Sequence, residues 1–252
     1  MASKKIEKGK DPGGHGHYLP VVNNSRFNGK VNLIEARIED PYNIVEPSKI
    51  FLSSMSDVFH EDVPIDFLKR LFAVMLDCQR HTFQVLTKRP ERVAEIKDAF
   101  DWPDNIWLGT SIEGPRVYDR VDALNQTPAA LKFLSVEPLL HAVPDLPLDG
   151  ISWVTCGGES GQRARPMEAD WVRDVRDRCV SQGIPFFFKQ WGKLFNNPDP
   201  TDPTATKIFE KKHKIKGGCT LDGEVWQQMP FIMPYHLEKK PSYGDEFFGD
   251  LC

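Results

Sequence analysis

The stretch Leu131-Lys132-Phe133-Leu134-Ser135-Val136-Glu137 decides the fold, because it is a short apolar run that ends in polar residues. The same pattern occurs in five other places. The other runs, each with its polar end, are 49–52 with 53–57, 82–86 with 87–89, 105–109 with 110–113, 151–154 with 155–159, and 184–188 with 189–191. Short apolar runs separated by helix-like segments predict parallel strands covered on both faces. In such folds the ligand site lies at the carboxyl ends of the strands.

Four segments between these strands carry the signals of helices. Their apolar residues recur at helical spacing, and Gly183 closes the last segment at the usual C-terminal cap position. The predicted helices span 62–75, 90–100, 116–124 and 171–179. The connection 139–149 contains two prolines and is too short for a full helix, so a loop is predicted there. This alternation predicts an α/β fold, a partial (βα) barrel of parallel strands related to the TIM barrel.

Composition divides the chain into three parts. Residues 1–45 are rich in glycine and asparagine and predict a loop-rich N-terminal segment. Residues 46–195 hold the strands and helices of the barrel-like core. Residues 196–252 begin with a proline-rich linker, and the pair Asp222-Gly223 then predicts a hairpin in a small C-terminal appendage that ends in a tail.

The bulk composition favours a protein that binds small molecules. The chain has 252 residues, of which 40% are apolar and 27% charged, and its formal net charge is -4. This balance gives no overall basic surface, so a nucleic acid partner is not expected, and the sequence names no protein partner. No apolar run approaches the roughly 18 residues that cross a bilayer, and residues 1–5 lack the apolar core of a secretory signal. A cytoplasmic location without a membrane partner is therefore predicted.

The five cysteines are scattered, and none lies at a metal-ligand spacing from another cysteine or from a histidine. A metal site is therefore not predicted from the sequence. Reduced and mostly buried thiols are the simplest interpretation, because free cysteine usually behaves as a small apolar residue.

Polar residues crowd the end of the first apolar run. Ser54, Ser56, Asp57 and His60 are candidate ligand contacts, and His60 could transfer a proton near neutral pH because the pKa of a free histidine is about 6.5. The alternative is a helix cap, with Asp62 as the capping residue. The sequence leaves both interpretations open, and it identifies no catalytic residue.

Two cations follow the second apolar run. Lys88 and Arg89 stand just before a helix start at Pro90, where backbone N–H groups point outward, so this corner suits a carboxylate or a phosphate. The alternative is a pair of surface charges bridged to Glu91 or Glu95.

Glutamates follow three neighbouring strands at the same position. Glu113, Glu137 and Glu159 each come shortly after the apolar part of a strand, and Ser111 and Ser135 precede the first two. Converging carboxylates repel each other unless a cation or a ligand offsets their charge. A shared ligand-binding mouth is therefore predicted. The alternative is that each glutamate pairs with a basic neighbour of its own.

The last two strands end in further candidate contacts. Gly157 and Gly158 would let a ligand approach the backbone closely, although a tight turn explains them equally well. Lys189, Gln190 and Trp191 supply a cation, an amide and an aromatic plane, which suit a flat or polar ligand. Trp191 could instead simply fill the end of the barrel.

An ordered series of motifs runs along the chain. The motifs are FLSSMSDVFHEDVP at 51–64, HTFQVLTKRPER at 81–92, WLGTSIE at 107–113, SVEPLL at 135–140, GGESG at 157–161, ARPM at 164–167, PFFFKQWG at 185–192 and LDGEVW at 221–226. This series resembles a family of uncharacterised proteins, the phage-type, radical-SAM-like family with an N-terminal three-cysteine motif. The resemblance covers most of the chain, from about residue 30 to residue 230.

This resemblance implies a barrel that holds a [4Fe-4S] cluster and S-adenosylmethionine at the strand ends. Its cluster ligands lie in an upstream cysteine-rich loop, and the first residues of this chain would align with the end of that loop. The three ligand cysteines are therefore absent, and a cluster is not expected in this chain. One hypothesis is a phage or prophage protein that is N-terminally truncated and inactive as a radical enzyme. The alternative is a cluster-free module that binds a small molecule or a protein.

Under the enzyme hypothesis the strand-end residues have expected roles. Ser135, Glu137 and Glu159 are candidates for contacts with a ribose or an amino group. Lys88 and Arg89 are candidates for contacts with a carboxylate or phosphate. The three residues 189–191 are candidates for the substrate side of the site.

Overall fold

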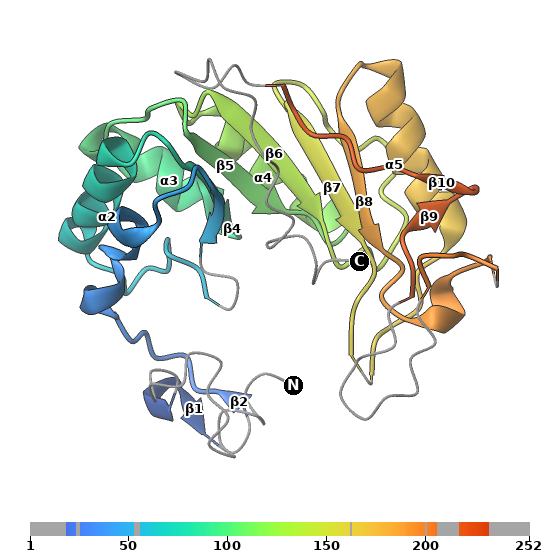
Figure 1. Ribbon diagram of the computed structural model, residues 1–252, viewed down its shortest axis with the longest axis horizontal. Coiled ribbons are helices and arrows are strands. Elements are labelled where there is room, and N and C mark those ends of the chain that lie inside the picture. Colours follow the sequence, from blue (N-terminus) through green and yellow to red (C-terminus); the bar gives the residue numbers. More distant parts are fainter. Residues whose placement is uncertain are drawn as a thin grey trace.

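The chain is built around one curved sheet of six parallel strands (Figure 1). This computed structural model describes residues 19–23, 26–52, 56–161, 163–199, 201–205 and 217–231. The strands are β3 (Lys49–Leu52), β4 (Thr82–Thr87), β5 (Ile106–Ser111), β6 (Leu131–Val136), β7 (Trp153–Gly157) and β8 (Phe186–Gln190). They lie in sequence order, and each neighbouring pair is parallel. The predicted α/β fold with a partial (βα) barrel is confirmed.

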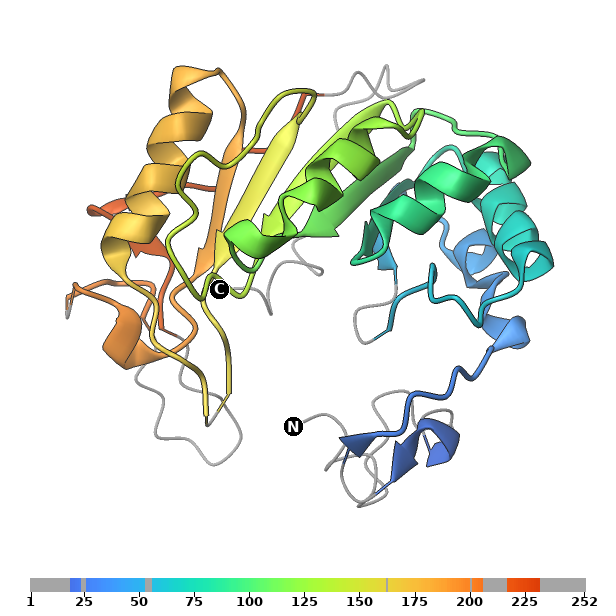
Figure 2. The ribbon, with the colours of Figure 1, turned by 180° about the vertical axis from the view of Figure 1, so that it is seen from behind.

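Four α-helices connect these strands and lie along the convex side of the sheet (Figure 2). They are α2 (Ile65–Asp77), α3 (Pro90–Ile96), α4 (Asp119–Asn125) and α5 (Ala169–Ser181). Short 3-10 turns extend two of them, with η4 (Lys97–Ala99) after α3 and η5 (Pro115–Val117) before α4. The connection between β6 and β7 contains no helix, as predicted. The prediction of cover on both faces is correct only for the convex face, since no described helix packs on the concave face.

Helix α2 illustrates how the sequence pattern produces this packing. Leu68, Leu71 and Met75 recur at three- or four-residue intervals, and all three are buried against the sheet in the main core. The residue before the helix is Pro64, and no side chain caps the first turn. The interpretation of Asp62 as a helix cap is therefore wrong.

Alternating side chains give the sheet two different faces. On β4, Phe83 and Val85 point into the helix-covered core, whereas Leu86 packs against a second cluster on the concave face. That second cluster consists of Trp107, Leu131, Phe133, Trp153 and Phe187. Its rings meet mostly edge to face, with Trp153 in contact with three of the others at centroid distances of 5.6 to 6.0 Å. The concave face therefore has an apolar floor, formed by the first halves of the strands.

The C-terminal appendage closes the β8 edge of the sheet. Phe188 donates its N–H to the carbonyl of Trp226 at 2.6 Å, and Gln228 donates its N–H to Phe186 at 3.0 Å. The predicted hairpin is present, with β9 (Thr220–Leu221) and β10 (Glu224–Val225) joined by the Asp222-Gly223 turn. Arg173 and Arg176 of α5 both bind Asp222, so the hairpin is tied to the last helix. No helix in the described ranges has the length and apolar character needed to cross a bilayer.

Short elements precede the sheet. They are η1 (Leu19–Val21), the antiparallel pair β1 (Val22–Asn23) and β2 (Arg26–Phe27), η2 (Glu35–Arg37) and η3 (Asp40–Asn43). Buried His81 attaches this segment to the core. Its Nδ1 accepts the Ser48 N–H at 3.1 Å, and its Nε2 lies 3.1 Å from the Pro41 carbonyl, to which it donates in the neutral tautomer.

We expect His81 to make the fold less stable in mild acid. Burial lowers the pKa of His81 below its ordinary value of 6.5, so the unfolded chain binds a proton that the folded chain does not. This contribution is complete above pH 6.5 and is lost as the pH falls below it. Urea unfolding at about pH 8 and about pH 5.5 measures the loss of stability, because these two pH values lie on either side of the ordinary histidine pKa of about 6.5. The His81→Gln variant should lose less stability across that interval, while the same change at exposed His141 should leave the wild-type difference intact.

Candidate ligand-binding site

A band of polar side chains follows the apolar floor along the concave face. Strand alternation places these residues on that face at the carboxyl ends of β4 to β8, directly above the floor residues. The polar band consists of Lys88, Ser111, Glu113, Ser135, Glu137, Thr155, Gly157 and Lys189, together with Arg120 from α4. Ser111 is paired in register with Ser135, and Ser135 with Thr155, so three hydroxyl side chains stand side by side on neighbouring strands.

Glu113 lies between two cations. Lys88 binds its Oε1, and Arg120 donates to its Oε2 at 3.0 Å. Arg120 also donates to the Ser111 carbonyl at 2.8 Å, which fixes its guanidinium at the end of β5. Burial would raise the pKa of Glu113, but the hydrogen bonds from Lys88 and Arg120 outweigh it and hold the pKa below the usual range. Glu113 is therefore a carboxylate at neutral pH.

Glu137 and Lys189 form the second ion pair of the band. The Lys189 Nζ lies 3.0 Å from Glu137 Oε2, and both side chains are about one quarter exposed. Gly157 lies directly beside the pair, since a Cβ there would be 3.4 Å from Glu137 Cδ and 3.4 Å from Lys189 Cβ. These are ordinary contact distances, so the packing does not require a glycine at position 157. The absence of a side chain there leaves the ion pair accessible from the concave face.

The hydroxyls of Ser111 and Ser135 make no described hydrogen bond to the protein. Ser111 is 3% exposed and Ser135 is 6% exposed, yet neither hydroxyl oxygen is among the fully buried atoms without a partner, so both oxygens touch solvent. Thr155 differs, because its hydroxyl lies 3.5 Å from the Leu134 carbonyl. A hydroxyl that touches solvent and is not used by the protein itself can donate to a ligand, so these two groups are suited to ligand binding.

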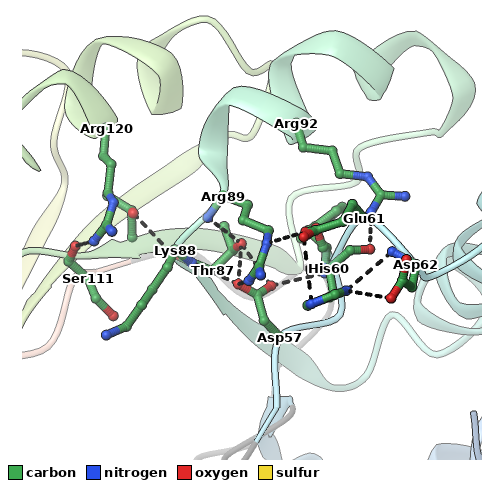
Figure 3. Close-up of polar contacts among 12 residues, drawn as sticks. Asp57, His60, Glu61, Asp62, Thr87, Lys88, Arg89, Arg92, Ser111 and Arg120 are labelled. Atoms are coloured by element: carbon green, nitrogen blue, oxygen red, sulfur yellow. Dashed lines mark hydrogen bonds and ion pairs between the residues drawn. The ribbon is translucent and has the colours of Figure 1, made fainter. Parts of the chain in front are cut away.

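Asp57 holds the loop after β3 against the end of β4 (Figure 3). Its carboxylate accepts the Thr87 hydroxyl at 2.9 Å, the Lys88 N–H at 3.0 Å and an Arg89 guanidinium N–H at 3.2 Å. It also accepts the Phe59 N–H of its own loop at 3.0 Å. The acceptor capacity of Asp57 is used by the protein itself, which indicates an anchoring role for this residue.

His60 belongs to the same anchored loop (Figure 3). Its Nδ1 accepts the Asp62 N–H at 3.2 Å, and its Nε2 lies 3.8 Å from a carboxylate oxygen of Glu61. Arg92 donates to the backbone carbonyls of His60 and Val63, which fixes the loop on α3. No described contact joins His60 to the polar band.

The sequence model of the family described as "Protein of unknown function (DUF5131)" matches residues 3–230 of the chain. The chain belongs to this DUF5131 family. The matched region contains the whole sheet and every residue of the polar band. No curated protein and no solved structure matches the chain. The prediction of an uncharacterised family is thereby confirmed.

In this DUF5131 protein, the alternative that pairs Lys88 and Arg89 with Glu91 or Glu95 is not found among the described contacts, whereas the alternative that gives each glutamate a basic partner describes the ion pairs. Lys88 binds Glu113, and Arg89 binds Asp57 and Glu61, so neither uses Glu91 or Glu95 among the described contacts. Glu159 accepts Arg165 at 2.9 Å, and this bond lowers the pKa of Glu159. Each of the three predicted glutamates therefore has a basic partner, and only Glu113 and Glu137 belong to the polar band.

Trp191 and Gly158 have structural roles in the DUF5131 fold. Trp191 is fully buried, donates its indole N–H to the Thr220 carbonyl at 2.8 Å and packs edge to face on Phe188. Gly158 lies against the same backbone, since a Cβ there would be 2.3 Å from the Trp191 carbonyl oxygen. The backbone carbonyl of Gln190 accepts the Gly158 N–H at 2.9 Å, and the Gln190 side chain is partly exposed. The alternative interpretation of Trp191, a residue that fills the end of the barrel, describes its position.

The structure brings together some of the predicted site residues and separates others. Ser111, Glu113, Ser135 and Glu137 share the polar band with three further predicted residues, namely Lys88, Gly157 and Lys189. Ser56 is exposed in the loop after β3, and Ser54 lies outside the described residues. Sequence reasoning missed Arg120 and Thr155. The strand register could have identified Thr155, whereas Arg120 stands among the charged residues of α4 and carries no distinguishing signal.

The described residues do not fit an iron-sulfur cluster. Cys78, Cys156, Cys179 and Cys219 are each buried as free thiols in separate parts of the chain, namely after α2, on β7, on α5 and before β9, while Cys252 lies outside the described part. Burial raises the pKa of the Cys179 thiol to about 12 and that of Cys156 well above its ordinary value, so both stay protonated. The described part of the chain holds no cluster of three or more His, Cys, Asp or Glu residues suited to a metal ion.

Proposed function

We propose that this protein is a cluster-free binding module for a small zwitterionic molecule, with S-adenosylmethionine as the ligand, and that it binds this ligand on the polar band. The observation that carries the proposal is the pair of neighbouring hydroxyls, Ser111 and Ser135, which make no described hydrogen bond to the protein and lie on the strands that lead to the ion-paired carboxylates Glu113 and Glu137. The donor and acceptor chemistry of the band fits S-adenosylmethionine. Glu113 and Glu137 can accept an ammonium or ribose hydroxyls, and the cations of the band can bind a carboxylate.

The protein's own contribution would be binding and orientation. The apolar floor excludes water beneath the band, so hydrogen bonds made there are stronger than at an open surface. Once bound, S-adenosylmethionine would supply a sulfonium centre that activates its attached carbons for transfer. The cysteines described above do not fit the cluster that the radical reaction needs, so no radical step is part of this proposal.

Calorimetric titration of the protein with S-adenosylmethionine tests the proposal. We expect saturable binding at one site, with a Kd on the order of micromolar. Glu137→Gln should weaken binding about tenfold, because it removes the charge that faces the ligand's cationic group. Glu91→Gln on the exposed side of α3 is the matched control and should bind like the wild type. An absence of saturable heat with the wild-type protein would reject the function.

A second candidate is a radical S-adenosylmethionine enzyme of phage or prophage origin, located in the cytoplasm. Its support is fold-level likeness, since six parallel strands in sequence order with polar carboxyl ends are what the motif resemblance implies. Anaerobic reconstitution with iron and sulfide, followed by absorbance spectroscopy, tests this candidate. Failure to form a cluster band would remove the radical enzyme and leave the binding module.

A further inference from the structure

We infer that Lys88 is a movable cation that leaves Glu113 and, together with the hydroxyls of Ser111 and Ser135, binds an oxyanion of the ligand. The inference rests on the proposed function, because it assigns one chemical group of the ligand to one part of the polar band. It applies to any ligand that carries a carboxylate or a phosphate.

The first argument is the double ion pair of Glu113. Its carboxylate has two cationic partners, Lys88 and Arg120. One of these partners can leave and the carboxylate is still neutralised by the other.

The second argument is the difference between those two partners. The Arg120 side chain is 18% exposed and is fixed by bonds to both Glu113 and the Ser111 carbonyl. The Lys88 side chain is 52% exposed, and its ammonium has Glu113 as its one described partner. Lysine carries a compact charge on a flexible stem, whereas the planar guanidinium of arginine is held by its geometry. Lys88 is therefore the partner that can move at low cost.

The third argument is the position of the free hydroxyls. Thr87 is paired in register with Thr110, so Lys88 stands beside Ser111 on the next strand, and Ser111 stands beside Ser135. Neighbouring strands lie about 4.8 Å apart, which lets two hydroxyls donate to different oxygens of one oxyanion. The Lys88 ammonium and the two hydroxyls would then surround the oxyanion. Carboxylates and phosphates are both bound by such a combination of a cation and hydrogen-bond donors.

Arg89 is not part of this subsite. Its Nε donates to Glu61 at 2.8 Å, and its NH1 lies 3.2 Å from Asp57 (Figure 3). The guanidinium is thus committed to holding the loop after β3. Of the two cations that the sequence places at this corner, Lys88 is the one available to a ligand.

Titration with inorganic phosphate and, separately, with acetate at constant ionic strength tests the subsite. The readout is the chemical shift of the backbone amides of residues 111 and 135. We expect saturable shifts with at least one of the two anions, and the tighter anion identifies the oxyanion class. Lys88→Met should weaken that binding about tenfold. Lys69→Met is the matched control, because the Lys69 side chain is 54% exposed on distant α2, and this variant should bind like the wild type.

A double Ser111→Ala and Ser135→Ala variant provides a second test that does not change charge. Neither hydroxyl makes a described hydrogen bond to the protein, so the variant should keep the wild-type thermal stability while anion binding weakens about tenfold. Unchanged anion binding in both the lysine and the serine variants would overturn the subsite. If S-adenosylmethionine nevertheless binds, the proposed function stands without it. If anions bind through Lys88 but S-adenosylmethionine does not bind, the subsite stands and the proposed function falls.

Discussion

Gly158→Ala is expected to destabilise the fold by about 3 kcal/mol or more, whereas Gly157→Ala next to it should cost less than about 1 kcal/mol. The reason is steric. A Cβ on Gly158 would lie 2.3 Å from the Trp191 carbonyl oxygen and 2.8 Å from the Trp191 carbonyl carbon, and backbone atoms cannot rotate away. A Cβ on Gly157 meets nothing closer than 3.4 Å. Equilibrium urea unfolding of both variants gives the two free energies.

Comparison of the Gly158→Ala and Gly157→Ala variants distinguishes a packing role of Gly158 from a role in ligand contact. If Gly158 served mainly to admit a ligand, its alanine variant would fold normally and only lose binding. If packing governs it, Gly158→Ala unfolds at much lower urea than Gly157→Ala. Equal stability of the two variants would contradict the close approach of β7 and Trp191 that the structure describes.

Asp202→Ala is expected to destabilise the protein by about 3 kcal/mol at neutral pH, through loss of a buried carboxylate that organises the C-terminal appendage. Asp202 is 4% exposed. Its oxygens accept the hydroxyl and N–H of Thr204, the side-chain amide of Asn197 at 2.7 Å and the N–H of Thr220. Removing the carboxylate leaves these donors unpaired. Asp199→Ala is the matched control, because the Asp199 carboxylate accepts only from Thr201 among the described contacts, and the change should cost less than about 1 kcal/mol.

The stabilisation by Asp202 should depend on pH. Burial would raise the pKa of Asp202, but hydrogen bonds from Thr204, Thr220 and Asn197 outweigh it, so the folded pKa lies below the ordinary value of 3.8. The contribution is therefore complete above pH 3.8 and is lost as the pH falls through the folded pKa. Urea unfolding curves of wild type and Asp202→Ala should differ most near pH 7 and converge in strong acid. A difference that grows on acidification would contradict this assignment.

The main sheet could be predicted from the sequence because each strand combines a short apolar run with a polar end. The run 131–134 followed by Ser135-Val136-Glu137 becomes β6 with its polar end at the carboxyl edge. The concave face was not predicted in the same way. The rings of Trp107, Phe133 and Trp153 fill it from strand positions that look the same in sequence as those facing the helices.

The sequence predicted many individual residues of the candidate site, but it did not predict which ion pairs they form. Sequence position placed Glu113, Glu137 and Glu159 at strand ends, and only the fold shows which cation each of them binds, such as Arg165 at Glu159. Trp191 looked like a ligand contact because it follows two polar residues, yet the appendage buries it against Thr220, a residue distant in the sequence. Such contacts depend on how the C-terminal hairpin returns to β8, which no local pattern specifies.

The most direct test of ligand binding on the polar band is a chemical-shift map of the isotope-labelled protein titrated with S-adenosylmethionine. We expect saturable shifts at the backbone amides of residues 111, 135, 137 and 157, with the amides of α2 and of the β9–β10 hairpin unchanged. Absence of shifts, or shifts confined to residues outside the concave face, would contradict the proposal that this face of the sheet is the binding site.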